Sequence, residues 1–165
     1  MFRTKLTRLF QIVLLSGMMF IHIEIASGQS TGGGQAQLVE GRSFIVRQGE
    51  EMEINSYPMD FKDQDLIQTF DKGKVHLTLK GGDVIFIAPK TEILFEEKLE
   101  TKGLVKISNR MLKLKGRLLA RIQRKTATPI QIRTPNAIVG VKGTEFVVEF
   151  LSKATNVGTL KGTVN

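Results

Sequence analysis

The sequence predicts an all-β protein, and two regularities lead to this conclusion. Apolar and polar residues alternate along several short runs, most clearly in "VHLTLK" at residues 75–80. This period of two places the apolar side chains on one face of a half-buried strand. Turn-forming stretches such as "DKGK" (71–74) and "KGGD" (80–83) separate the runs, and a spacing of roughly ten residues is typical of all-β domains. We therefore expect a single domain of short strands, arranged as a solenoid-like roll or a distorted sandwich.

The first thirty residues have the three-part layout of a secretory signal. A basic start leads into an apolar run over Ile12–Ile21, and the small residues Ala26 and Gly28 follow it. The alternative, an uncleaved membrane anchor, would need ~20 apolar residues and would place Glu24 in the bilayer. We predict a helical signal peptide at residues 1–28, a flexible glycine-rich linker at 29–37 and a folded domain at 38–165. The signal predicts export to the periplasm or the cell surface.

Later runs continue the strand pattern. Further strands are predicted at residues 105–107, 112–115, 130–134 and 146–150. The run "VIFIA", residues 84–88, is apolar on both faces, which indicates a deeply covered strand. The stretch 109–125 is the nearest to a helix, but a helix would spread its apolar residues over most of its surface. We favour two strands hinged at Gly116, each with its apolar residues on one face.

Composition limits the classes of function. Lysine and arginine number 24 against 16 acidic residues, which gives a formal net charge of +8, and a basic surface favours anionic partners. Cysteine is absent. This excludes disulfides, thiolate metal sites, a cysteine nucleophile and lipidation at an N-terminal cysteine.

The run "TPNAIVGVKGTEF", residues 134–146, has the glycines and lysine of a phosphate-binding loop but not their order. A P-loop places Gly-Lys-Ser/Thr at its end and continues into a helix. Here Lys142 precedes Gly143, and a strand pattern follows. A dinucleotide-binding fingerprint fails for the same reason.

An architectural role explains the same run better. Proline is typical of strand starts and edges, and glycine of positive φ or close backbone approach. We therefore predict a strand, a tight corner at "VKG" (141–143) and a second strand. The residues of this structural motif are Thr134, Pro135, Gly140, Gly143, Thr144 and Phe146.

These residues resemble the signature of the FecR-type periplasmic domain family. "TPNAIVGVKGTEFVVEF" (134–150) is similar to its Thr-Pro, small and apolar residues, Gly-Thr-x-Phe and following strand. "DLIQTFDKGKVHLTLKGGDVIFIAPKTEILF" (65–95), "LKLKGRLLARI" (112–122) and "ATNVGTLKGTVN" (154–165) resemble other elements of the family. The resemblance covers most of residues 41–164.

The resemblance implies an exported, all-β, non-catalytic protein. The founding type transmits a signal from an outer-membrane iron transporter to a membrane-bound sigma-factor regulator, with a cytoplasmic segment and a membrane span before this domain. Here a signal peptide precedes the domain directly. The family continues for more strands, so we expect the domain at 38–165 to be incomplete at its C-terminus. We also expect its last strand to present an edge for partner pairing.

No catalytic or metal site is predicted. His22 falls in the signal peptide, and His76 is expected to be a solvated residue on the polar face of its strand. Two acidic clusters, one formed by Asp60, Asp63 and Asp65 and the other by Glu96, Glu97 and Glu100, are interleaved with lysine. This pattern is typical of a soluble turn surface. We therefore expect no enzyme activity and no cofactor.

A basic run provides the remaining candidate site. On strands, Lys113 and Lys115 share one face and Arg117 and Arg121 share another, and together they could bind an anion. A solvated face that discourages aggregation is the alternative. The region lacks the interleaved aromatic residues of a single-strand nucleic-acid binder, so nucleic acid is not an expected partner.

The sequence thus predicts a non-enzymatic binding or signalling module of the bacterial envelope that recognises a protein partner through its surface or a sheet edge. The alternative is an envelope binder of anionic glycan or lipid through the basic strand face.

Overall fold

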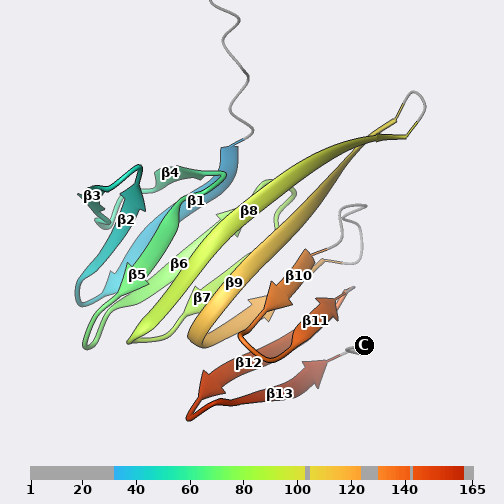
Figure 1. Ribbon diagram of the computed structural model, residues 1–165. Helices are drawn as coiled ribbons and strands as arrows, with labels where there is room; N and C mark the ends of the chain where they lie inside the picture. The colour runs from blue at the N-terminus through green and yellow to red at the C-terminus, as the bar shows by residue number, and fades with distance from the viewer. Residues whose placement is uncertain (1–31, 103–104, 124–129, 142, 162–165) are drawn as a thin grey trace, which may run out of the picture.

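The structure, a computed structural model, describes residues 32–102, 105–123, 130–141 and 143–161. In these ranges the chain forms thirteen β-strands and no helix, which confirms the predicted all-β class (Figure 1). Within the same ranges no helix has the length and hydrophobicity of a membrane span. The predicted signal peptide and its helix lie outside the described residues.

The strands follow one another with short turns, as the sequence pattern predicted. The first seven are β1 (Gly32–Glu40), β2 (Ser43–Arg47), β3 (Glu50–Glu53), β4 (Met59–Lys62), β5 (Leu66–Thr69), β6 (Lys74–Leu79) and β7 (Val84–Ile87). The remaining six are β8 (Thr91–Lys102), β9 (Val105–Arg121), β10 (Ile130–Arg133), β11 (Ile138–Val141), β12 (Glu145–Leu151) and β13 (Ala154–Lys161).

All thirteen strands belong to one curled, open sheet. Its main path runs β3-β2-β5-β8-β9-β7-β6-β1-β4, and the pairs β10–β11 and β12–β13 branch from β9. The first part of β9, through Lys115, pairs with β8 and β10. The second part, from Gly116, pairs with β7 and β12. We call the strands around the first part the β8 half and those around the second part the β7 half.

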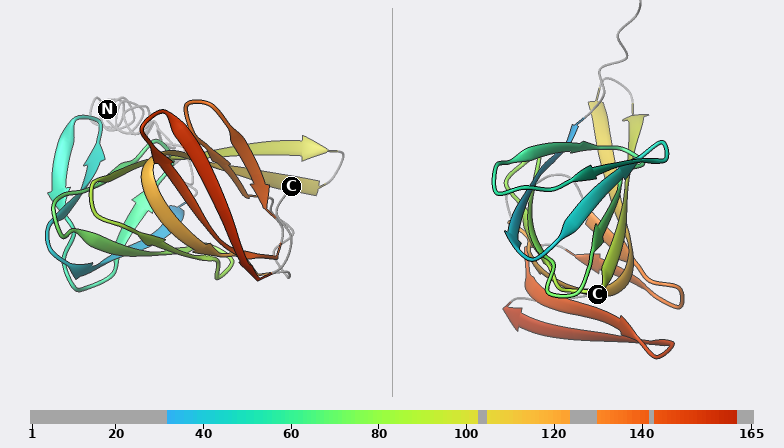
Figure 2. Two further views of the ribbon diagram at one scale, coloured as in Figure 1. Left: turned by 90° about the horizontal axis from the view of Figure 1, so that it is seen from below. Right: turned by 90° about the vertical axis from the view of Figure 1, so that its left-hand side faces the viewer.

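The sheet curls round on itself (Figure 2, right), and the buried apolar side chains form one hydrophobic core inside the curl. Alternate residues of both halves point inward and are buried, as in Phe95 of β8 for the β8 half and Ile87 of β7 and Leu118 of β9 for the β7 half. Phe95 packs edge to face on Phe61 of β4, with 5.1 Å between the ring centroids and 83° between the planes. Such a geometry is favoured by the quadrupoles of the two rings. Because only one face of the sheet is covered, Phe86 of the run 84–88 is 39% exposed, and the prediction of deep cover on both faces is wrong.

The predicted linker at 29–37 is also wrong for most of its length, because β1 begins at Gly32 and pairs with both β4 and β6. The glycines of this run serve close packing instead of flexibility. A Cβ atom on Gly33 would lie 2.6 Å from the rings of Phe61 and Phe95, and one on Gly34 would lie 2.1 Å from the Thr78 carbonyl oxygen. Glycine is required where backbone and side chains approach this closely.

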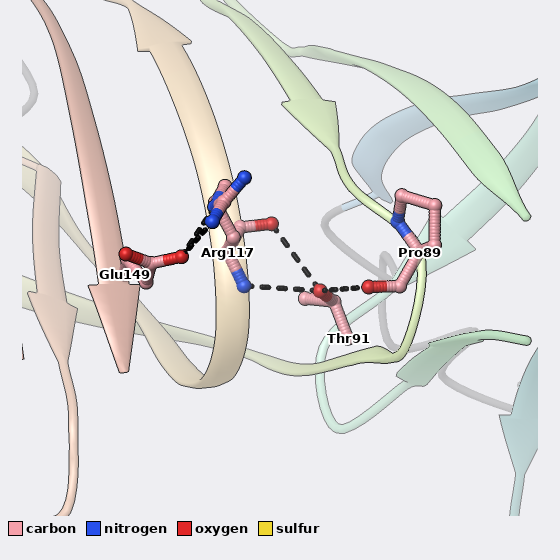
Figure 3. A network of polar contacts seen from close by, with 4 residues as sticks. All are labelled: Pro89, Thr91, Arg117 and Glu149. Carbon is pink, nitrogen blue, oxygen red and sulfur yellow. Dashed lines mark hydrogen bonds and ion pairs between the residues drawn. The ribbon is translucent and has the colours of Figure 1, made fainter. Parts of the chain in front are cut away.

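The stretch predicted as two strands hinged at Gly116 is one continuous strand, β9, that bends at this glycine. Gly116 has φ +114°, and a Cβ atom there would lie 2.4 Å from Thr91 Oγ1. Thr91 supports the bend: its Oγ1 accepts a hydrogen bond from the Arg117 N–H at 3.0 Å and lies 3.2 Å from the Pro89 carbonyl (Figure 3). The bend carries β9 from the β8 half into the β7 half.

Candidate functional site

The residues of the motif 134–146 form the predicted strand, corner and second strand. β11 ends at Val141 and β12 begins at Glu145. Of the two glycines, Gly140 lies within β11 opposite Gln131, and Gly143 lies at the corner with φ +64°. The two strands do not pair with each other, however. β11 pairs with β10 in the β8 half and β12 pairs with β9 in the β7 half, so the corner carries the chain between halves.

The end of the motif anchors this corner in the core. Phe146 is fully buried and Thr144 is 2% exposed. The Thr144 carbonyl accepts a hydrogen bond from the Ile122 N–H at 2.9 Å, which joins the corner to the end of β9. A buried aromatic ring next to a satisfied backbone group fixes where β12 starts.

The beginning of the motif holds the β12–β13 hairpin. Thr134 is 4% exposed, and its Oγ1 accepts a hydrogen bond from the Ala137 N–H at 3.1 Å within the β10–β11 turn. The same hydroxyl lies 2.7 Å from Thr155 Oγ1 at the start of β13. Asn136 Nδ2 donates to the Lys153 carbonyl at 3.0 Å. We call these contacts of Thr134, Asn136 and Thr155 the hairpin clamp.

The hairpin that the clamp holds ends in an open sheet edge. Within the described residues β13 pairs only with β12, and it lies at the lower edge of Figure 1. Of its apolar side chains, Val157 is 43% exposed and Leu160 is 61% exposed. An edge of this kind presents unpaired backbone N–H and C=O groups to an incoming strand.

The four cations proposed as an anion-binding stripe are all exposed on the outer side of β9, while the alternate residues Leu114, Gly116, Leu118 and Ala120 are buried. The prediction of two different faces is therefore wrong. Each cation also has a carboxylate partner: Lys113 with Glu96 (2.6 Å), Lys115 with Glu92 (3.6 Å), Arg117 with Glu149, and Arg121 with Glu145 (3.0 Å). Each cation of the stripe is thus matched by a neighbouring carboxylate, so the four cations alone do not form a surface with excess positive charge.

His76 is not the solvated residue that the sequence predicts. It is half-buried and its ring stacks on Phe86 of the neighbouring strand, with centroids 4.8 Å apart and 6° between the planes. Its Nε2 is buried and has no hydrogen-bond partner among the residues that the structure describes. A general base needs a partner that orients it and access to a substrate proton, and the described surroundings of His76 supply neither.

The acidic clusters differ from the predicted soluble surface at Asp65, which is fully buried. The Arg47 guanidinium donates hydrogen bonds to both oxygens of this carboxylate, at 2.8 and 2.7 Å. The Lys62 backbone N–H donates a third, at 2.7 Å. The hydrogen bond to Asp65 raises the pKa of the Arg47 guanidinium above its ordinary value. No group of metal-binding side chains gathers in the ranges that the structure describes, and Asp65 is a structural residue that fixes the β4–β5 turn.

The curled sheet, the Thr-Pro turn and the Gly-Thr-Glu-Phe corner together define an all-β domain with exposed strand edges. The family model described as FecR protein matches residues 65–165. The chain therefore belongs to the FecR family, as its motif predicted. The match begins at the buried Asp65 and leaves β1 to β4 outside it. Comparisons with curated proteins and with solved structures give no significant match.

Membership of the FecR family indicates a functional class. FecR proteins are a regulatory and signalling family associated with the bacterial envelope, and they are not known as enzymes. The chain is accordingly a signalling-related envelope protein.

Proposed function

We propose that this protein is a non-catalytic, exported module that binds an extended segment of another envelope protein at the free edge of β13. The incoming segment pairs with β13 by backbone hydrogen bonds, which is the mode called strand addition. The single observation that carries the proposal is the long edge of β13 that no other strand of the described residues pairs with, and the signalling class of the family supports it.

The length of β13 distinguishes it from the other edges. β3, β4 and β11 are also paired on one side only in the described part of the chain, but each has four residues, whereas β13 has eight. Very short edges are one of the ways in which proteins prevent unwanted pairing. An eight-residue edge offers enough backbone groups for a stable added strand, since every second residue of an antiparallel edge faces outward.

The composition of β13 supports the same choice. Lysine, proline and closely spaced charges protect natural edges, and β3 carries three glutamates in its four residues. Residues 154–160 of β13, "ATNVGTL", contain neither a charged residue nor proline. The exposed Val157 and Leu160 supply side-chain contacts to an added strand.

The absence of cysteine makes the test clean, because each introduced cysteine is the only one in the chain. Gly158→Cys provides a thiol on β13 to which a photo-cross-linker is attached. A Cβ atom at this position meets nothing within 4 Å. Val39→Cys, at a 61% exposed position of β1, away from β13, is the matched control. We expect the β13 probe, and not the control, to cross-link one defined envelope protein at high salt as well as low.

Amide hydrogen exchange then tests the mode of binding. With the identified partner bound, the amides of residues 154–161 should exchange more slowly, because strand addition protects them. Equal cross-linking from both probes, capture that high salt abolishes, or unchanged exchange in β13 would each contradict binding at this edge.

A further inference from the structure

A hollow of about 380 Å³ opens on the outer side of the β8 half, beside the β10–β11 turn. One row of paired residues crosses it: Leu66 of β5 lies opposite Leu94 of β8, and Leu94 lies opposite Lys113 of β9. Arg133 of β10 continues the row next to Lys113. The hollow exists because β10 ends at Arg133 while its neighbour β9 continues, so the sheet has a gap there.

The lining divides into an apolar part and a cationic part. Leu66 and Leu94 are half-buried, and Pro135 of the turn forms an apolar wall. The charged side chains around them are three cations and one carboxylate, namely Lys113, Lys115, Arg133 and Glu92. Small-molecule sites of roughly 300–1,000 Å³ combine an apolar lining with a few polar groups in this way.

Arg133 differs from the four cations of the predicted stripe. The four cations of the predicted stripe all have carboxylate partners. No hydrogen bond or ion pair joins the exposed Arg133 side chain to another residue in the described ranges. Its planar guanidinium can bind a phosphate or carboxylate through two parallel hydrogen bonds. Lys113 and Lys115 form surface ion pairs that contribute little, so both can turn toward an added anion.

We propose that the hollow binds one acyl chain of an anionic envelope lipid. The chain lies on Leu66, Leu94 and Pro135, and the phosphate or carboxylate of the head group binds Arg133 with Lys113 and Lys115 beside it. Charge complementarity selects an anion, and the leucine floor selects an acyl chain over a sugar, which would leave its hydroxyl groups against apolar side chains. This site is separate from the β13 edge, and neither proposal requires the other.

Binding of dodecyl phosphate to the purified protein, measured by titration calorimetry below its micelle concentration, tests the proposal. Laurate carries a carboxylate on a similar chain, dodecyl maltoside carries an uncharged head group, and inorganic phosphate has no chain. We expect dodecyl phosphate and laurate to bind at one site, and the other two to bind at least about tenfold more weakly, since each lacks one of the two matched features.

Matched variants locate the site. Arg133→Gln should weaken dodecyl phosphate at least about tenfold, whereas Arg121→Gln, an exposed arginine of β9 outside the hollow, should leave the affinity unchanged. Leu94→Ser should weaken the binding of both amphiphiles, and Leu99→Ser, at a 54% exposed position of the same strand, should not. Circular dichroism confirms that each variant is folded.

Four results would overturn the proposal: no binding of dodecyl phosphate, equal binding of dodecyl maltoside, inorganic phosphate as strong as dodecyl phosphate, or equal effects of the two arginine variants. The third result would indicate a simple anion site, and the second an unspecific apolar surface.

Discussion

Gly116 is the residue at which the sheet changes direction. It combines a positive φ of +114° with a close approach of Thr91, because a Cβ atom added at Gly116 would lie 2.4 Å from Thr91 Oγ1 and 2.8 Å from Thr91 Cα. Thr91 in turn bonds to the Arg117 backbone on the far side of the glycine. An L-residue at this place meets both a disfavoured backbone conformation and a steric clash, and each is a separate cost.

Gly116→Ala should therefore destabilise the protein by about 3 kcal/mol or more, as expected for a strained backbone together with overpacking. The free energy of unfolding in urea measures the effect. Gly158→Ala is the control, because a Cβ atom there meets nothing within 4 Å, and its effect should stay within about 0.5 kcal/mol. Similar losses in both variants would show that Gly116 is not required at the bend.

The hairpin clamp gives a structural role to a motif whose composition is similar to that of a phosphate-binding loop. The hydroxyl of Thr134 forms hydrogen bonds both within the β10–β11 turn, with Ala137, and to Thr155 at the start of β13. β13 has no other strand than β12 to hold it in the described chain. The position of the proposed binding edge thus depends on side-chain hydrogen bonds from a turn that lies in the other half of the sheet.

Thr134→Val removes this hydroxyl and keeps the shape of the side chain. Since the half-buried Ala137 N–H then loses its partner, we expect a loss of about 1–2 kcal/mol and faster amide exchange in residues 154–161. Thr78→Val, on an exposed strand position, should change neither. If exchange rises evenly over all strands, or not at all, the clamp does not hold β13.

At the level of single elements, the sequence pattern predicts what is local. Period-two alternation identifies β6, the later strands and the corner before Phe146, because each depends only on neighbouring residues. The same pattern predicts a linker at the glycines of β1 and is wrong there, because their role depends on Phe61 and Phe95, which are distant in sequence. It also misplaces the basic stripe on two faces and cannot identify its carboxylate partners, which lie on β8 and β12.

Across the whole molecule, what the sequence could not predict is which strands pair. β1 pairs with β6 and β4, and β10 runs parallel to β9 after a separate excursion of the chain. These pairings join segments far apart in sequence, and alternation says only which face is apolar. The Asp65–Arg47 pair is of the same kind, since nothing near Asp65 in the sequence identifies its partner.

β9 belongs to both halves, so we expect the two halves to fold as a single unit. Leu112 and Leu118 lie on either side of the bend, both fully buried, the first opposite Phe95 of β8 and the second opposite Ile87 of β7. If the strands of either half unfold, β9 loses part of its pairing and is no longer held in position for the strands of the other half. We therefore expect one cooperative transition on unfolding, in agreement with the prediction of one domain.

Leu112→Ala and Leu118→Ala test this directly, because each leaves a cavity in a different half. Each should destabilise the protein by about 2–5 kcal/mol, and each should lower the urea midpoint of methyl resonances in both halves equally. Leu99→Ala, at an exposed position of β8, should leave the midpoints unchanged. Were Leu118→Ala to lower the midpoint only for methyl groups of the β7 half, the two halves would be separate domains, and β9 would be a linker between them and not their common strand.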